Sequence, residues 1–106
     1  MSVHIRLVTA TETLVRGTDG MERRRDALKA RIMENLDLLI GTVNRTPAQS
    51  GWYLTAKVEG KSVTRYVRAS IRTEAKTMTR RHVRVRELLR RLSEVNWKLL
   101  LARSNG

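Results

Sequence analysis

Six arginines fall within twelve residues in the second half of this 106-residue chain. Glu87 and Glu94 are the only acidic residues near enough along the chain to neutralise any of them. A guanidinium group is planar and donates paired hydrogen bonds that match the oxygens of a phosphate, so this group favours contact with a polyanion. A solvated surface, or one that faces a protein partner, would carry the same residues. The six are Arg80, Arg81, Arg84, Arg86, Arg90 and Arg91.

The sequence offers no set of residues typical of an enzyme. The acids of its second half are four separate glutamates, whereas metal-dependent phosphoryl transfer needs a cluster of carboxylates. It contains no P-loop, no dinucleotide-binding glycine motif and no Ser-His-Asp set. It has no Cys, and its two histidines, His4 and His82, have no further metal ligands at matched spacing. We therefore expect no catalytic residue, no cofactor and no metal.

The positive charge of the chain is unevenly distributed. The net charge is +12 and the pI is about 11.5. Residues 42 to 106 hold fifteen Lys and Arg against four Glu, so they carry eleven of the twelve surplus charges. Such a positively charged protein could bind nucleic acid, an anionic membrane surface or an acidic protein. A pI above about 9 is typical of nucleic-acid-binding domains, so nucleic acid is favoured over the other two.

Composition limits the class of protein. No apolar run approaches the roughly 20 residues of a membrane-spanning helix, and the N-terminus lacks the basic region of a secretion signal. We expect a soluble protein of the prokaryotic cell interior or nucleoid. Aromatic residues make up 4% of the chain and Phe is absent, which predicts a thin aliphatic core in one domain, residues 1–106. Such a thin core favours a homodimer.

The first half of the chain predicts one strand and one helix. In the N-terminal segment 1–20, Val3, Ile5 and Leu7 alternate with polar residues, which predicts a short strand over 3–9. Thr18 and Asp19 precede Glu22 at the spacing of a helix N-cap. The apolar positions that follow predict a helix over 21–41, with Gly41 as its stop.

A β-hairpin is predicted over 52–68, with Gly60 and Lys61 in the turn. This turn would place Leu54 opposite Val67 and Tyr53 opposite Arg68. One face is then mainly apolar, with Arg65 as the exception, and packs on a helix. The other face is basic and aromatic, and it could enter a nucleic-acid groove, stack bases on its tyrosines or simply be solvated. The candidate binding residues of the hairpin are Lys57, Lys61, Arg68, Tyr53 and Tyr66.

A long helix is predicted over 70–103, with Ser70 as its N-cap and Glu74 in its first turn. Its apolar positions alternate in steps of four and three, which is coiled-coil spacing. His82 and Asn96 fall on this seam, and we expect them to serve packing or register. Leu88, Val95 and Ala102 widen the seam beyond a two-helix contact. The seam comprises Ile71, Ala75, Met78, His82, Val85, Leu89, Leu92, Asn96 and Leu99.

Several short motifs resemble those of a family of short, basic, uncharacterised proteins encoded beside transposases and other mobile-element genes. The resemblance covers roughly residues 22 to 102. It implies a mobile-element setting and no established activity. Many members carry a Cys-rich segment before the hairpin, where this chain has residues 44–50 without Cys. The motifs are Gly41-Thr42-Val43, Tyr53-Leu54-Thr55, Gly60-Lys61, Arg65-Tyr66-Val67, Glu74, Arg86 and Leu92-Ser93-Glu94-Val95-Asn96-Trp97-Lys98-Leu99-Leu100.

These observations predict an α+β protein in which a helix, a β-hairpin and a long C-terminal helix pack with the helices antiparallel. We expect it to bind DNA or RNA mainly through phosphate contacts, as an accessory protein of a mobile element. The alternatives are a basic protein that docks a transposase, nuclease or other acidic partner without touching nucleic acid, and a membrane-surface binder, which is disfavoured. The candidate helix residues are Arg80, Arg81, Arg84, Arg90 and Arg91.

Overall fold

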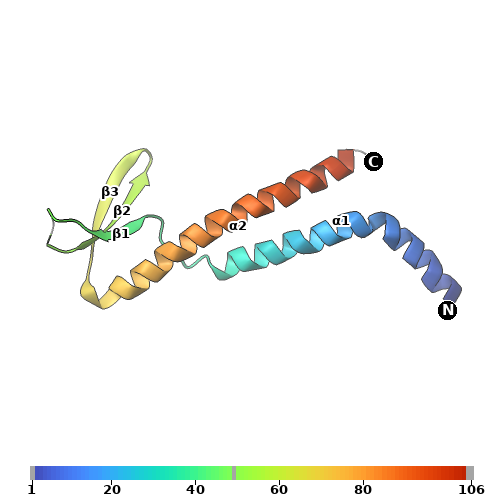
Figure 1. Ribbon diagram of the computed structural model, residues 1–106, viewed down its shortest axis with the longest axis horizontal. Helices are drawn as coiled ribbons and strands as arrows, with labels where there is room; N and C mark the ends of the chain where they lie inside the picture. The colour runs from blue at the N-terminus through green and yellow to red at the C-terminus, as the bar shows by residue number, and fades with distance from the viewer. Residues whose placement is uncertain (1, 49, 105–106) are drawn as a thin grey trace. The chain divides into compact units, whose positions relative to one another are not determined.

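The computed structural model describes residues 2–48 and 50–104, with side chains from residue 18 onward. The chain runs through α1 (Ser2–Glu34), β1 (Thr42–Arg45), β2 (Trp52–Val58), β3 (Lys61–Val67), the 3-10 turn η1 (Ala69–Ile71) and α2 (Arg72–Ser104) (Figure 1). It divides into two compact units. The helical unit comprises Met1–Arg31 and Leu88–Gly106, and the sheet unit comprises Ile32–Glu87. The predicted α+β class is confirmed.

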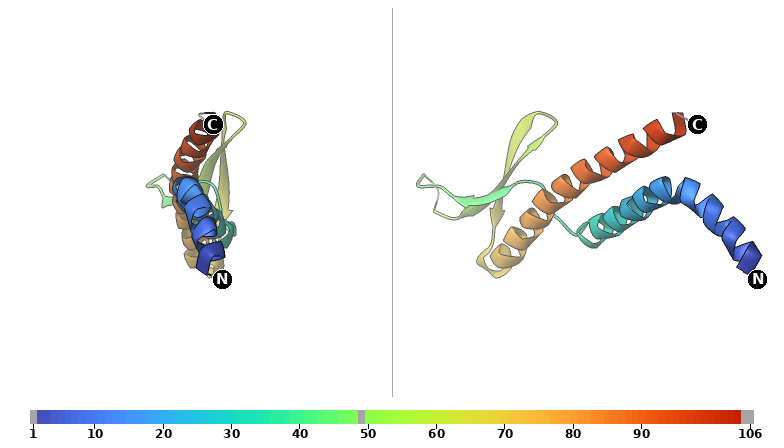
Figure 2. Two further views of the ribbon diagram at one scale, coloured as in Figure 1. Left: turned by 90° about the vertical axis from the view of Figure 1, so that its right-hand side faces the viewer. Right: turned by 45° about the vertical axis from the view of Figure 1, so that its right-hand side comes forward.

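In the helical unit, α1 packs antiparallel against the second half of α2, as predicted (Figures 1 and 2). Leu28 of α1 is buried, and Leu88, Val95 and Leu99 are the buried residues of α2 in this unit. Each helix satisfies its own backbone hydrogen bonds, so the pair needs only an apolar stripe on each partner to associate. The contact is aliphatic because the buried positions hold Leu and Val.

The predicted strand over 3–9 is wrong, because these residues belong to α1. The alternation was short and Val8 interrupted it, while Ile5 and Val8 also have the i,i+3 spacing of a helix. A helix pairs its backbone groups locally, whereas a strand needs a neighbour. The predicted helix start near Gly20 is wrong for the same reason. Asp19 lies inside α1 and forms an ion pair with Arg23 at 3.5 Å, one turn along the helix.

The predicted end of this helix at Gly41 is also wrong, because α1 ends at Glu34. The next residues dock on α2 instead of extending the helix. The Leu39 N–H donates to the carbonyl oxygen of Met78 at 3.1 Å, and Arg81 Nη1 donates to the carbonyl oxygen of Asp37 at 2.8 Å. These tertiary hydrogen bonds replace those that further helical turns would supply.

The sheet has three antiparallel strands in the order β1-β2-β3, so the predicted hairpin gains an extra strand. The short β1 pairs with β2 and sets Val43 opposite Leu54. Val43, Leu54 and Val67 are buried on one face, which we call the inner face, and they form a core with Ala75 of α2. A two-stranded hairpin is only marginally stable by itself, and this core gives its apolar face the packing partners that it needs.

The hairpin register differs from the prediction by two residues. Val58 pairs with Lys61, Leu54 with Arg65 and Tyr53 with Tyr66, so the turn is formed by Glu59 and Gly60. Both turn residues have positive φ, 52° for Glu59 and 80° for Gly60, which is the signature of a type I′ turn. A shift by an even number of residues keeps every side chain on its predicted face.

The long C-terminal helix is confirmed, although its seam differs from the prediction. Ser70 lies in η1 instead of capping α2, and Ile71 is half exposed. The buried positions of α2 are Ala75, Val85, Leu88, Val95 and Leu99. Leu89 is 49% exposed and Asn96 is exposed, because the neighbouring Leu88 and Val95 take the buried positions. His82 is half-buried, as its place on the seam predicted.

All buried apolar residues in the described part of the chain are aliphatic, and none of them is completely shielded from solvent. The expectation of a thin aliphatic core is therefore confirmed. In the same part of the chain, neither helix has an apolar stretch long enough to cross a membrane.

Gly41→Ala is expected to destabilise the sheet unit by about 2 to 4 kcal/mol, from backbone strain and overpacking. Gly41 has a φ of +136°, and an added Cβ would lie 2.6 Å from the Thr55 carbonyl oxygen, a backbone atom that cannot turn aside. Urea unfolding followed by Trp52 fluorescence, in a Trp97→Phe background, measures the loss. Gly20→Ala is the matched control, because nothing lies within 4 Å of that position. It should stabilise α1 by about 0.5 to 1 kcal/mol, and equal losses in both variants would contradict the close approach.

Glu59→Asn is expected to stabilise the hairpin by about 0.5 to 1 kcal/mol, since Asn tolerates positive φ at low cost and Glu does not. The same unfolding measurement applies. Glu59→Gln removes the charge and keeps the strained conformation, so it should give little of this gain. If Gln stabilises as much as Asn, the charge of Glu59 and not its backbone conformation is responsible.

Candidate nucleic-acid interface

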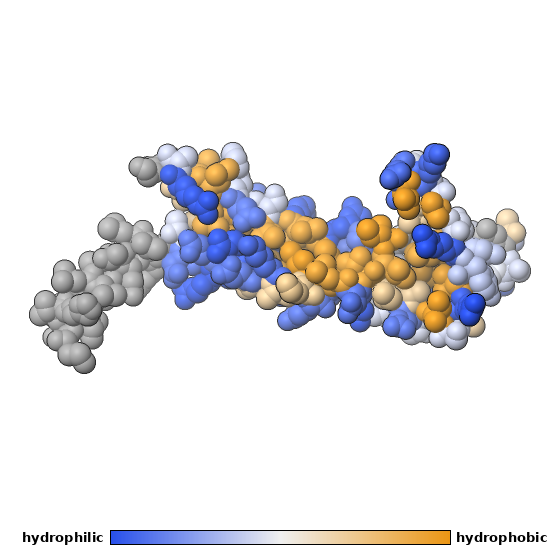
Figure 3. Space-filling model, turned by 180° about the vertical axis from the view of Figure 1, so that it is seen from behind, coloured by the Kyte–Doolittle hydropathy of each residue, from blue (hydrophilic) through white to orange (hydrophobic). Residues whose placement is uncertain are grey.

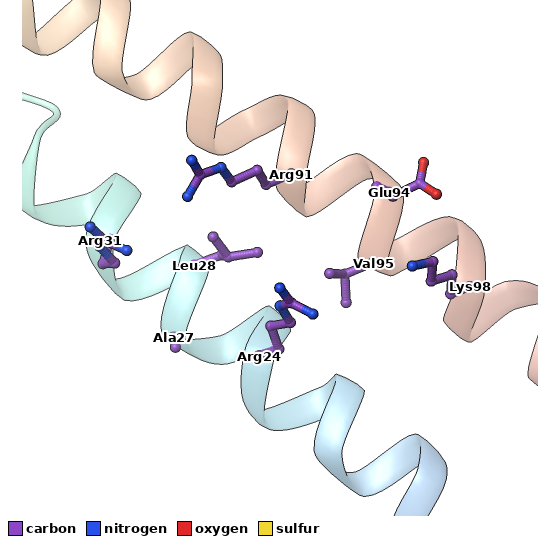
Figure 4. Close-up of a pocket in the computed structure, with 8 residues that line it drawn as sticks. All are labelled: Arg24, Ala27, Leu28, Arg31, Arg91, Glu94, Val95 and Lys98. Atoms are coloured by element: carbon purple, nitrogen blue, oxygen red, sulfur yellow. The ribbon is translucent and has the colours of Figure 1, made fainter.

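A cationic groove of about 340 Å³ lies in the helical unit between α1 and α2 (Figure 4). Ala27, Leu28 and Val95 form its apolar part. Its charged lining consists of Arg24 and Arg31 from α1, with Arg91, Glu94 and Lys98 from α2. The two helices present these residues because the polar positions beside a buried stripe are carried to the edges of the helix contact.

The cationic groove is strongly positive, since its lining residues include four cations and one carboxylate. In Figure 4 the guanidinium of Arg24 lies between the helices beside Val95, and the carboxylate of Glu94 points away from α1. Arg24 and Lys98 are exposed, and so are Arg31 and Arg91, which each take part in a further interaction within the chain. The groove therefore offers guanidinium and ammonium donors beside an apolar surface that cannot neutralise them.

Two of the other cations of α1 are paired with acids. Arg23 pairs with Asp19, and Arg25 Nε donates to Asp26 Oδ1 at 2.9 Å. The hydrogen bond from Arg25 lowers the pKa of the exposed Asp26 carboxyl, so this acid stays ionised beside its partner. Local acids thus offset Arg23 and Arg25, whereas Arg24 between them lines the groove.

The predicted arginines of α2 are divided between the two units. Arg91 lines the cationic groove, and Arg90 is exposed in the same unit and takes part in an interaction within the chain. In the sheet unit, Arg84 is exposed and Arg80 lines a hollow of about 260 Å³ beside Lys76. Arg81 is half-buried, and its bond to the Asp37 carbonyl gives it a role in holding the fold.

The predicted hairpin residues separate onto two faces. Tyr53, Tyr66 and Lys57 lie on the outer face, opposite the buried Val43, Leu54 and Val67. The two tyrosines are a direct cross-strand pair, with ring centroids 5.7 Å apart and ring planes at 65°. The prediction that Tyr53 faces Arg68 is therefore wrong. Lys61 lies at the start of β3 on the inner face, and Arg68 follows β3 and is exposed.

Sequence reasoning missed Arg24, Arg31 and Lys98 as site residues. The signal was available on α1, where Arg24 and Arg31 flank Leu28 at helical spacing. It also missed two cations that serve the fold. Arg72 and Lys76 lie over the ring of Trp52, at 5.0 Å from Cζ and 4.1 Å from Nζ to the ring centroid. No local pattern could reveal that contact, because it joins β2 to α2.

Comparison with protein-family models, with curated proteins and with solved structures finds no match for this chain. The resemblance to proteins of mobile elements therefore stays a prediction.

Proposed function

We propose that this protein binds nucleic acid, mainly through phosphate contacts, as an accessory protein of a mobile element in the cytoplasm or nucleoid of a prokaryotic cell. The observation that carries the proposal is the cationic groove, where four Lys and Arg side chains converge beside a single carboxylate. The net charge of +12 supports it, since a field of that size attracts polyanions and speeds their association.

The chemistry of the groove suits phosphate more than an acidic side chain. Arg24, Arg31 and Arg91 can each donate paired hydrogen bonds to phosphate oxygens, and Lys98 adds a point charge. Contacts of this kind position a backbone without reading its sequence. We therefore expect the affinity for nucleic acid to depend little on base sequence and strongly on salt concentration.

A second candidate function is docking of a transposase, a nuclease or another acidic protein. An apolar groove of about 430 Å³ in the sheet unit supports it, with Lys57 and Arg65 among its lining residues. Apolar side chains also reach the surface of the hairpin, at the upper right of Figure 3. The other lining residues are Leu39, Ile40, Leu54, Ala56, Val58 and Val63.

A homodimer belongs to the same proposal. In the helical unit Leu89, Trp97, Leu100 and Leu101 are between 43% and 55% exposed on α2, although they are large and apolar. Burying them against a second copy would add apolar contact to a thin core. Sedimentation equilibrium of the purified chain measures the assembly directly, and a monomer at all concentrations would remove this part of the proposal.

The double variant Arg24→Gln/Lys98→Gln is expected to weaken duplex binding and to lower the salt slope by about 1.8, because each lost phosphate contact removes about 0.9. Fluorescence anisotropy with a labelled duplex, between about 50 and 200 mM salt, measures both. The matched control is Arg23→Gln/Arg25→Gln, which removes the same net charge from side chains that are already paired with acids. It should change the slope far less.

Two results would count against the proposal. Equal weakening by both double variants would assign binding to net charge and not to the groove. No binding of duplex or single strand by the unchanged protein at low salt would remove the nucleic-acid function. Retained capture of a transposase by the same preparation would then favour the docking function.

A further inference from the structure

The outer face of the sheet presents an ordered row of aromatic and polar side chains. The register sets Asn44 beside Tyr53 and Tyr53 beside Tyr66, so the three lie across the strands in one line. The next line is formed by Thr42, Thr55 and Thr64. All of these side chains are on the face opposite the buried core, and we call this surface the tyrosine face.

Tyr66 is held in place while much of it stays accessible. The ring of Tyr53 makes an edge contact with the ring of Tyr66, and the two ring centroids are 5.7 Å apart. Gly51 lies against the ring, because a Cβ at that position would be 2.8 Å from Cε1 and 3.4 Å from Cδ1 of Tyr66. Tyr66 is nevertheless 62% exposed. A ring that is fixed by its neighbours and open to solvent is preorganised for stacking, since little freedom is lost when a flat ligand binds.

The width of the sheet argues against insertion into a duplex. Neighbouring strands lie about 4.8 Å apart, so three strands and their side chains approach or exceed the roughly 12 Å of the major groove. That groove admits a helix or a two-stranded ribbon. The short strand β1 pairs with residues 52–55 of β2, so it widens the sheet beside Tyr53 and Tyr66 and disfavours insertion of this part into the groove.

We propose that the tyrosine face binds single-stranded nucleic acid, with an unpaired base stacked on Tyr66. This inference rests on the proposed nucleic-acid function and names the form of nucleic acid that the sheet unit takes. Bases in a duplex are covered by their neighbours, whereas those of a single strand can lie on an aromatic ring. Lys57, exposed on the same face, supplies a cation for the backbone. DNA and RNA share this chemistry.

Tyr66→Leu is the test, because Leu keeps an apolar side chain and removes the aromatic ring. Loss of stacking on one aromatic side chain should weaken the binding of a single strand by about 5- to 100-fold. Binding of duplex should be unchanged by Tyr66→Leu. Tyr66→Phe is the matched control and should retain the affinity within about threefold, since the ring face is kept. Anisotropy with labelled deoxyribose and ribose single strands and with duplex DNA measures all arms, and separates DNA from RNA as the preferred strand.

Tyr66→Trp supplies a readout that does not depend on a loss of binding. The exposed indole should be quenched when a single strand stacks on it, and duplex should quench it far less. In this variant Trp52 and Trp97 are replaced by Phe, so the signal comes only from the indole introduced by Tyr66→Trp. Unchanged emission from that indole, at a single-strand concentration that saturates anisotropy, would overturn the proposal.

The outcomes also separate this inference from the proposed function. If Tyr66→Leu leaves single-strand and duplex binding unchanged while Arg24→Gln/Lys98→Gln weakens them, the stacking role is overturned and phosphate binding stands. Equal weakening of single strand and duplex by Tyr66→Leu would also overturn it. If the unchanged protein binds neither form, both proposals fail together.

Discussion

One apolar stripe on α2 supports everything else in this protein. Ala75 closes the core of the sheet, and Leu88, Val95 and Leu99 form the contact with α1. The buried residues of the described part of the chain are all aliphatic, and the half-buried ring of Trp52 packs against the core of the sheet. Because the buried residues occupy one side of the helix, many of its other positions are exposed and can hold charge. The cationic character of α2 follows from that division between its faces.

The cations of α2 do not all perform the same task. Arg72 and Lys76 cover the ring of Trp52, and Arg81 holds the segment after α1 through a backbone carbonyl. These contacts stabilise the sheet unit, and the three side chains that make them are less available to an external ligand. Arg91 and Lys98 instead join Arg24 and Arg31 at the cationic groove. A count of positive residues therefore overstates the binding surface, and the identity of the groove residues matters more than their number.

Glycine controls how closely the parts of the sheet unit approach one another. Gly41 lets the chain pass against the Thr55 carbonyl, and Gly51 leaves room for the ring of Tyr66. In both places the neighbour is in another part of the chain, so packing requires glycine, and at Gly41 the φ of +136° requires it as well. The strained Glu59 in the hairpin turn contrasts with them, since its positive φ reflects only the geometry of the turn.

The sequence by itself determined the class of the fold, the hairpin, the long basic helix and the two faces of the hairpin strands. These follow from hydrophobic periodicity, which is a local property of the chain. Tertiary structure decided the rest. Residues 3–9 are helical, since a helix needs no neighbouring strand to pair its backbone groups. β1 forms because β2 offers it an edge. In the seam of α2, Leu88 and Val95 are buried in place of Leu89 and Asn96. The cationic groove joins residues of α1 to residues of α2, and the ring of Tyr66 meets Tyr53 and Gly51. Spacing along the chain can mark candidates on one element, but only packing brings the elements together.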